Sequence, residues 1–240
     1  MNANKEILSS IMHQLEQLGK EQTKKTYMNH GAREPLFGVT TGALKPLAKK
    51  IGKDYELSIQ LYNTGNYDAM YLAGMIADYN KMTKQDFEKW IQEAYCHGIA
   101  NYTVAVTLAE SCLAQELADN WIKSDEELYA SAGWSCYEWL LGYKPDNNFD
   151  KEKILRYLEV IEKTIHSQPN WVKYAMNNFV ISVGISYLPS HQEAIQVAQK
   201  IGVVIVDNGK TNCQTPNATV YIQRAIDKNR LGFKRRNVRC

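Results

Sequence analysis

Residues Thr83–Tyr95, TKQDFEKWIQEAY, carry the pattern that decides the fold. Thr83 and Asp86 have the spacing of a capping box, in which a hydroxyl and a carboxylate satisfy the free N–H groups at a helix start; Asp86 stands in for the usual Glu. The apolar side chains that follow fall on one helical face: Phe87, Trp90, Ile91 and Tyr95. The stretch therefore predicts an amphipathic helix with one buried face.

Similar helix signals recur on both sides of this stretch. The apolar residues between Ile7 and Leu18 form one helical stripe, and Gly19 follows as a stop. Further helix starts are predicted by capping-box spacing at Ser124 with Glu127 and Ser190 with Glu193, by Pro216 at a first helical position, and by N-cap residues at Asp54, Asn66 and Asp150.

Helices account for nearly all of the periodicity. Roughly a dozen helices with short links favour antiparallel neighbours, and six pairs would give about 40 residues a pair, near the length of HEAT-type repeats. We therefore predict an all-α fold: an α-solenoid (α-α superhelix) of about six antiparallel helix pairs of HEAT-like repeats, forming a single domain over residues 1–240. The exception is Ile201–Asn212, which we interpret as an extended buried connection.

The composition is that of a soluble globular protein, with 45% hydrophobic and 22% charged residues. No apolar run approaches the ~18 residues of a membrane helix, and the first residues show no signal-peptide pattern. The five cysteines, Cys96, Cys112, Cys136, Cys213 and Cys240, are scattered without a CxxC motif. Buried or free thiols in a reducing compartment fit this pattern, so we expect a cytoplasmic protein, associated with the nucleoid if it is bacterial.

The net charge of +2 conceals opposed regions. Residues 20–53 hold eight basic and two acidic residues, a balance of +6. Residues 54–219 sum to −9, and residues 220–240, with seven basic and one acidic residue, again reach +6. The last stretch, which includes Arg239, is dense enough to contact phosphates, although many basic tails serve only solubility. The concave face of a solenoid offers a way to gather two clusters that are distant in sequence.

No sequence motif for metal or nucleophile chemistry is present. The histidines, His13, His30, His97, His166 and His191, form no HExxH motif and no Cys/His pair at ligand spacing. GxSxG and GxxxxGK[ST] are also missing. We therefore expect no metal site and no cofactor.

Several stretches resemble the HEAT-like-repeat DNA alkylation repair superfamily, the AlkD-type alkylpurine DNA glycosylases. The matching stretches are 27–39, 121–125, 172–177, and 206–216 with 221–222. The resemblance implies an α-solenoid whose basic concave face holds duplex DNA. In glycosylase members, a Trp and an Asp on one helix, an Arg on the next repeat and a further Trp serve a cationic alkylated base. The Asp offsets the positive charge that develops at the sugar.

That catalytic set is missing from this sequence. Aligned by the resemblance, the family positions are occupied by Tyr102, Val106, Ser131 and Asn178. An apolar Val106 cannot stabilise a developing cation, and the nearest acid, Glu110, lies one helical turn further on. The resemblance therefore implies a member of the superfamily without the usual catalytic residues.

The favoured hypothesis is a DNA-binding HEAT-like-repeat protein that contacts the phosphate backbone of bent, damaged or branched DNA, acts as a monomer without membrane contact, and has lost glycosylase activity. The predicted DNA contacts are Lys24, Lys25, Arg33, Lys45, Lys49, Lys50, Lys173, Arg224, Lys228, Arg230, Lys234, Arg235 and Arg236. One alternative is an active DNA glycosylase for alkylated purines, with Tyr102 and Trp134 stacking on the lesion and Glu110 supplying the charge. The other is a protein-binding helical scaffold with an apolar concave surface.

Overall fold

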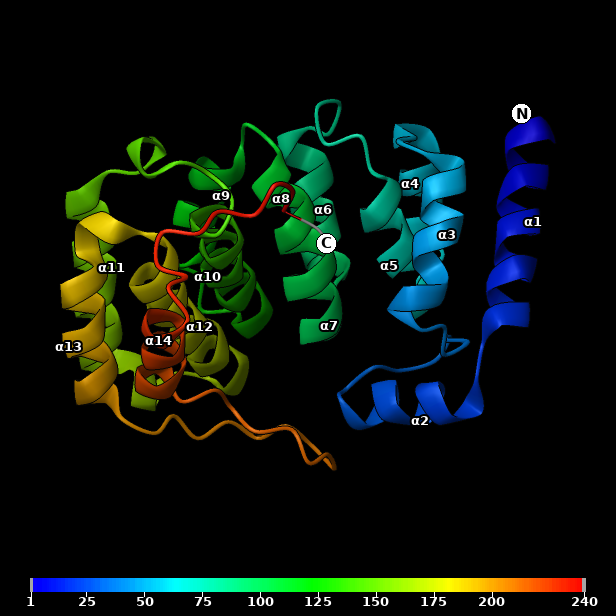
Figure 1. Cartoon of the computed structure of the whole chain (residues 1–240). Helices are drawn as coiled ribbons and strands as arrows, with labels where there is room; N and C mark the ends of the chain where they lie inside the picture. The colour runs from blue at the N-terminus through cyan, green and yellow to red at the C-terminus, as the bar shows by residue number, and fades with distance from the viewer. Residues whose placement is uncertain (1, 239–240) are drawn as a thin grey trace. The chain divides into compact units, whose positions relative to one another are not determined.

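The computed structural model describes residues 2–238 and, from Lys5 to Val238, their side chains. Every regular element among the described residues is a helix, and the fold matches that of a solved HEAT-like-repeat protein, which confirms the predicted fold class. Contacts group the chain into two compact units (Figure 1). The first comprises the described residues up to Leu113 with Asn208–Asn212, and the second comprises Ala114–Asp207 and the residues from Cys213 onward. The single-domain organisation stays a prediction.

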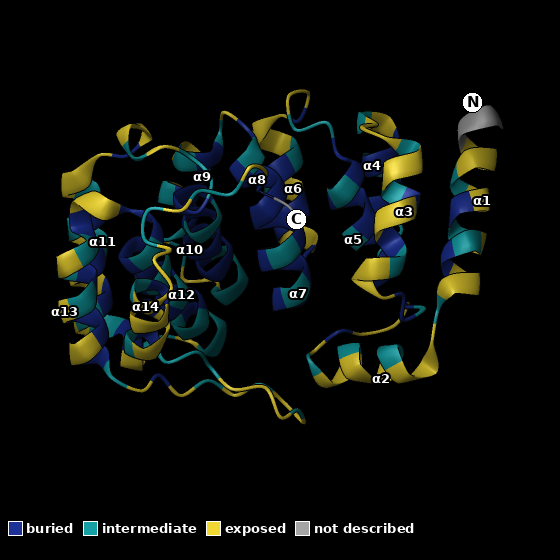
Figure 2. Ribbon diagram, viewed as in Figure 1, coloured by how far each residue is buried: buried dark blue, intermediate teal, exposed yellow. Residues whose placement is uncertain are grey.

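The first unit is organised around helix α5. Its helices are α1 (Asn2–Leu18), α2 (Glu21–Asn29), α3 (Thr41–Ile51), α4 (Tyr55–Tyr62), α5 (Tyr67–Ile76), α6 (Lys84–Glu93), α7 (His97–Ile99), the π-helical turn η1 (Ala100–Val104) and α8 (Ala105–Glu110). Helix α5 packs against α1, α3, α4, α7, η1 and α8. Its interior position matches its composition, because most of its residues are buried, whereas α2 has no fully buried residue (Figure 2).

Three predicted helix starts in the first unit are confirmed. The side chains of Asp54 and Asn66 accept N–H groups at the starts of α4 and α5. Thr83 and Asp86 form both halves of the predicted capping box at the start of α6. The buried face of α6 then stacks Trp90 against Tyr62, with ring centroids 4.3 Å apart and nearly parallel planes. The pattern in Thr83–Tyr95 therefore predicts the start and the buried face of the helix, although α6 ends at Glu93 and Tyr95 lies beyond it.

A buried carboxylate holds the loop between α2 and α3. Asp68, in the first turn of α5, accepts the backbone N–H groups of Phe37, Gly38 and Val39 at 2.6, 3.0 and 2.7 Å. Gly38 has a φ of +81°, and a Cβ there would lie 2.5 Å from the backbone nitrogen of Lys24. Only glycine fits that conformation and that close approach. The loop is therefore fixed between α2 and α5.

The second unit is built on the packing of α10 against α12. Its elements are α9 (Ala114–Trp121), α10 (Glu127–Leu141), η2 (Asp146–Asn148), α11 (Lys151–Thr164), η3 (Ile165–Ser167), α12 (Asn170–Ser186), η4 (Leu188–Ser190), α13 (His191–Ile201) and α14 (Ala218–Asp227). Asp150 caps α11 as predicted. An aromatic cluster fills the core, with Trp134 5.3 Å from both Tyr157 and Phe179 in edge-to-face geometry.

Asp119 joins three helices of the second unit. Its carboxylate on α9 accepts a hydrogen bond from Tyr137 on α10 and another, at 2.7 Å, from Tyr157 on α11. Lys153 on α11 pairs with it at 2.7 Å. The lysine and the two hydroxyls together hold the pKa of Asp119 below its usual value, against the opposing effect of burial, which is the largest single influence.

Three predicted helix starts in this unit are wrong in detail. Helix α10 begins only at Glu127, and the Glu127 carboxylate accepts the N–H of Trp171 at the start of α12 instead of closing a box with Ser124. Helix α13 begins where expected, but the Ser190 side chain makes no capping bond. Helix α14 begins after Pro216, because Asn217 caps it by accepting the N–H of Val220. A partner from another helix overrides the local pattern at Glu127, and a better neighbouring cap overrides it at Pro216; the missing Ser190 cap has no structural explanation.

The segment between α13 and α14 is extended, as predicted, but it is not buried throughout. Val204 is buried, whereas its neighbours Val203 and Ile205 are among the most exposed apolar side chains described. Adjacent side chains of an extended segment point to opposite sides, so only one side can contact the helices.

Cys96, Cys112 and Cys136 are free thiols, as predicted. Cys96 and Cys136 are buried, and Cys112 and Cys213 are exposed; Cys240 lies outside the described residues. Among residues 2–238, no helix has the length and apolar character needed to cross a membrane.

Candidate nucleic-acid interface

Helix α3 presents three exposed lysines in the first unit. Lys45, Lys49 and Lys50 are all exposed, and the last two stand in the final turn of the helix. The N-cap Thr40 accepts the N–H of Ala43, which fixes where the helix begins and therefore which way its lysines face. The helix dipole stabilises cations near a helix C-terminus, so it favours Lys49 and Lys50 at this position.

The other predicted contacts of the first unit differ in availability. Lys24 is engaged in an ion pair with Glu34 at 2.6 Å, and a hydrogen bond to Glu34 raises the pKa of Lys24. Arg33 lies over the ring of Tyr95 at 4.6 Å and is still exposed. Lys25 is exposed on α2. Lys24 would therefore have to give up Glu34 to reach a phosphate.

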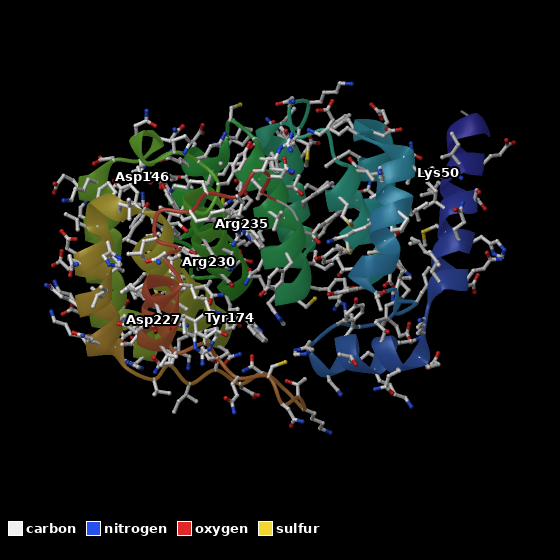
Figure 3. All side chains as sticks on the ribbon, in the orientation of Figure 1. Lys50, Asp146, Tyr174, Asp227, Arg230 and Arg235 are labelled. Carbon is white, nitrogen blue, oxygen red and sulfur yellow. The ribbon has the colours of Figure 1, made fainter. Side chains whose placement is uncertain are left out.

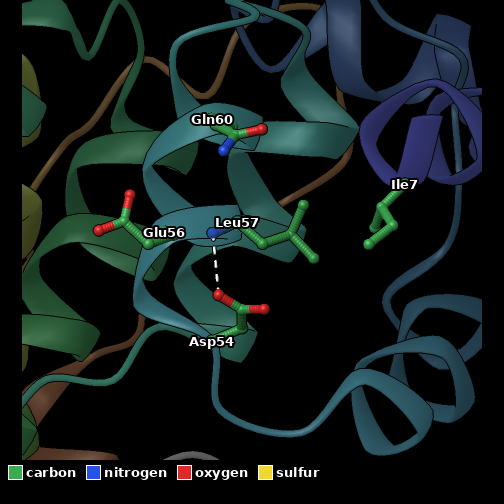
Figure 4. A pocket seen from close by; sticks show the side chains of 5 residues that line it. All are labelled: Ile7, Asp54, Glu56, Leu57 and Gln60. Atoms are coloured by element: carbon green, nitrogen blue, oxygen red, sulfur yellow. Dashed lines mark hydrogen bonds between the residues drawn. The ribbon is translucent and has the colours of Figure 1, made fainter. Parts of the chain in front are cut away.

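A pocket in the first unit has the wrong charge for a phosphate. It has a volume of about 260 Å³ and is lined by Ile7, Asp54, Glu56, Leu57 and Gln60 (Figure 4). Asp54 is already used as the cap of α4, accepting the N–H of Leu57 at 3.0 Å. Two carboxylates at this pocket would repel an anion, so we do not assign it to DNA.

In the second unit, four predicted contacts are exposed: Arg224, Lys228, Arg230 and Arg236. Arg224 lies over the ring of Tyr221, 5.5 Å from its centroid. Lys173 is half-buried near the start of α12. Arg239, the last cation of the basic cluster, lies outside the described residues.

Lys234 and Arg235 are bound within the protein, unlike their basic neighbours. We call residues 230–238 the C-terminal strap. Lys234 donates to the carbonyl of Leu141, the last residue of α10, at 2.8 Å and pairs with Asp146 at 2.8 Å. Asp146 and Arg235 are labelled in Figure 3. The backbone N–H of Arg235 donates to Gly142 at 2.8 Å. These bonds satisfy carbonyl groups at the end of α10 that the helix itself leaves free.

The guanidinium group of Arg235 packs against the last turn of α10. It lies 4.9 Å from the ring centroid of Trp139 and beside Glu138. Burial raises the pKa of Glu138 to about 7, although the charge of Arg235 and a hydrogen bond with Asn178 both lower it. Sequence reasoning did not identify Glu138; the available signal was a single acid in the apolar run from Ala130 to Leu141.

The four family positions differ in burial and in their contacts. Val106 and Ser131 are buried, and the Ser131 hydroxyl donates to the carbonyl of Trp171 at 3.1 Å. Tyr102 is half-buried in η1, with its ring 6.4 Å from that of His97. Asn178 is half-buried and bonded to Glu138. Val106 and Ser131 are thus interior side chains, and Val106 carries no charge.

Trp134, the residue that the glycosylase alternative expects to stack on a lesion, lies in the protein core. Trp134 is only 1% exposed, within the aromatic core of its unit. Its ring is packed against Tyr157 and Phe179, so it has no free face for a nucleobase. The expectation that Trp134 stacks on a lesion is therefore wrong.

The chain is similar to known proteins over nearly its whole length. The family model described as "DNA alkylation repair enzyme" matches residues 11–222. "Uncharacterized protein Lin0241" of Listeria innocua is 32% identical over 222 residues, which cover 90% of this chain and 95% of that protein. "Uncharacterized protein Lmo0209" of Listeria monocytogenes is 30% identical with the same coverage.

A solved structure matches more closely still. It is described as "A new family of proteins related to the HEAT-like repeat DNA glycosylases with affinity for branched DNA structures". It shares 52% sequence identity with this chain, and the match has a TM-score of 0.90 over 97% of this chain and 99% of that one.

Proposed function

The chain belongs to the family of DNA alkylation repair enzymes, and we propose that it acts there as a DNA-binding HEAT-like-repeat protein. It binds the phosphate backbone and prefers branched DNA, as the protein of the similar solved structure has affinity for branched DNA. The observation that carries this proposal is the set of exposed cations on α3, α14 and the C-terminal strap. Phosphate contacts of this kind give affinity without sequence selectivity.

We further propose that base excision by the family mechanism has been lost. The support is chemical: Val106 has no carboxylate, and both Val106 and Ser131 are buried. Cleavage of a glycosidic bond needs an anion near the developing positive charge, and these positions supply none. We also propose that the protein acts as a monomer in the cytoplasm, or on the nucleoid if it is bacterial.

A salt series tests the binding. The affinity for a labelled four-way junction and for a linear duplex is measured by fluorescence anisotropy from low to physiological salt. We expect tighter binding to the junction and, on duplex, a slope of log K against log salt of about −0.9 for each phosphate contacted. A flat response, or no binding to either DNA, would contradict the proposal.

Incubation with DNA that carries a methylated purine tests the loss of excision. We expect no released base. Release that is abolished by Glu110→Gln would show an active glycosylase with a rearranged site.

A further inference from the structure

Phe233 stands exposed in the middle of the C-terminal strap. Its exposed fraction is 64%. Four cations lie within three residues of it in sequence, at Arg230, Lys234, Arg235 and Arg236, and no acidic residue occurs between 228 and 238. An aromatic ring among cations is the composition of a surface that binds unpaired nucleic acid.

The backbone on both sides of Phe233 is fixed. On one side, the N–H of Gly232 donates to the carbonyl of Ile185, in the last turn of α12, at 2.8 Å. On the other, Lys234 and Arg235 are bonded to the end of α10. Val238 is buried and anchors the end of the described chain. An exposed ring on a loose tail could lie in many places, whereas the backbone that carries this ring is anchored on both sides.

The anchors divide the cations of the strap by role. Lys234 and Arg235 turn inward and hold the segment, whereas Arg230 and Arg236 are exposed on either side of Phe233. A ring held in place with cations beside it loses little conformational entropy when a ligand stacks on it.

We propose that Phe233 stacks on an unpaired base where a DNA duplex branches or is interrupted, while Arg230 and Arg236 neutralise the adjacent phosphates. This rests on the proposed DNA binding and names the residue that gives it a preference for branched DNA. In a continuous duplex each base is already stacked on its neighbours, so the ring gains nothing there. At a branch or bulge, an exposed base offers its face, and stacking on an aromatic side chain is worth about 1–3 kcal/mol.

The test compares two DNAs of equal length in the full chain: a continuous duplex and the same duplex with unpaired adenines in a bulge. Wild type, Phe233→Ala and Phe233→Trp are titrated by anisotropy. We expect Phe233→Ala to weaken binding to the bulged DNA about 5- to 150-fold. Binding to the continuous duplex should change less than twofold, and Phe233→Trp should restore the wild-type preference.

A second readout follows the base itself. With 2-aminopurine in the bulge, stacking quenches its fluorescence, so wild type should quench and Phe233→Ala should not. Val160→Ala is the matched control, because Val160 is an exposed apolar residue of the same unit, on α11, beside acidic residues. It should leave both affinities unchanged. Circular dichroism confirms that each variant is folded.

The outcomes separate this proposal from the one it rests on. If wild type binds neither DNA, DNA binding fails and the stacking role fails with it. If wild type binds both DNAs and Phe233→Ala behaves identically or weakens both equally, the stacking role alone is wrong. The same variants are also titrated with vesicles that contain anionic phosphatidylserine. If wild type binds the vesicles, and Phe233→Ala loses that binding while its affinity for DNA is unchanged, Phe233 contacts a membrane surface instead.

Discussion

Lys234 and Asp146 form an ion pair of 2.8 Å between the C-terminal strap and the start of η2. Both side chains are mostly shielded, with exposed fractions of 21% and 29%. The same ammonium group bonds the Leu141 carbonyl, so it joins a carboxylate to a helix end. A cation in a strongly basic segment is thereby used to fix that segment in place.

Asp146→Asn should weaken DNA binding, even though it makes the protein more positive. Without the carboxylate the strap loosens, and its exposed cations lose their fixed positions. We expect a several-fold lower affinity and a salt slope reduced by at least one contact, about 0.9. Simple electrostatics predicts the opposite, tighter binding. Asp125→Asn adds the same charge at an exposed position of the same unit and should not weaken binding; a gain in affinity with Asp146→Asn would refute the anchoring role.

Lys49→Ala should remove one phosphate contact from α3. We expect the salt slope to fall in magnitude by about 0.9, with a uniform loss of affinity across DNA sequences. Lys81→Ala removes another exposed lysine from the same unit, one that is paired with Asp78, and serves as control. Equal effects of the two variants on the salt slope would mean that only net charge matters.

His97 should make the fold sensitive to mild acid. Burial, and secondarily the charge of His30, lower the pKa of His97 to about 4. The unfolded chain titrates near 6.5, so it binds more protons between these values, and stability falls as the pH drops from about 6.5 to 4. The loss is at most about 3 kcal/mol. Urea unfolding of His97→Gln should show a flatter pH profile than wild type; parallel profiles would refute the assignment.

Glu138 should act in the opposite direction over an overlapping range. Because its folded pKa is raised to about 7, its neutral form stabilises the fold below about 4.5, and that stability is lost as the pH rises through 7. Glu138→Gln replaces the carboxylic acid by an amide of similar shape that cannot ionise. We expect it to be more stable than wild type at pH 8, by at most about 3 kcal/mol, and to match it near pH 4. Thermal melts at the two pH values check this, and equal differences at both would contradict it.

Asp119→Asn should destabilise the second unit by about 2–3 kcal/mol, because a charged acceptor shared by Lys153 and two tyrosines is lost. The wild-type carboxylate contributes fully above about pH 4, and the contribution is lost as the pH falls through its lowered pKa. The gap in denaturant midpoint between wild type and variant should therefore be constant from pH 5 to 8. A gap that varies over that range would point to a different group.

The helical fold could be predicted because its signals are local. Thr83 and Asp86 cap their helix within four residues, and Asp54, Asn66 and Asp150 do the same. The resemblance to the DNA alkylation repair superfamily is confirmed by the match over residues 11–222. Glu127 could not be placed, because it bonds Trp171, 44 residues away. Local spacing carries no information about a partner that folding brings from another helix.

The basic clusters were visible in the sequence, but the role of each cation was not. Lys234, Arg235 and Arg236 are consecutive, yet only Arg236 is exposed. The difference comes from Asp146, Glu138 and Trp139, which lie about 90 residues earlier in the chain. For the same reason the sequence did not identify Glu138 or Phe233, because their environments depend on the contact between the strap and α10.

The three N–H groups held by Asp68 have a consequence for the dynamics of the first unit. Phe37, Gly38 and Val39 lie in a loop, where amide hydrogens ordinarily exchange with solvent within seconds. Because their acceptor sits at the start of α5, they can exchange only when that helix end moves away. Their deuterium uptake should therefore be slow and synchronous, and should follow the opening of α5 as one cooperative unit. The amides of this loop, which has no regular structure, are therefore protected for as long as the start of α5 stays closed.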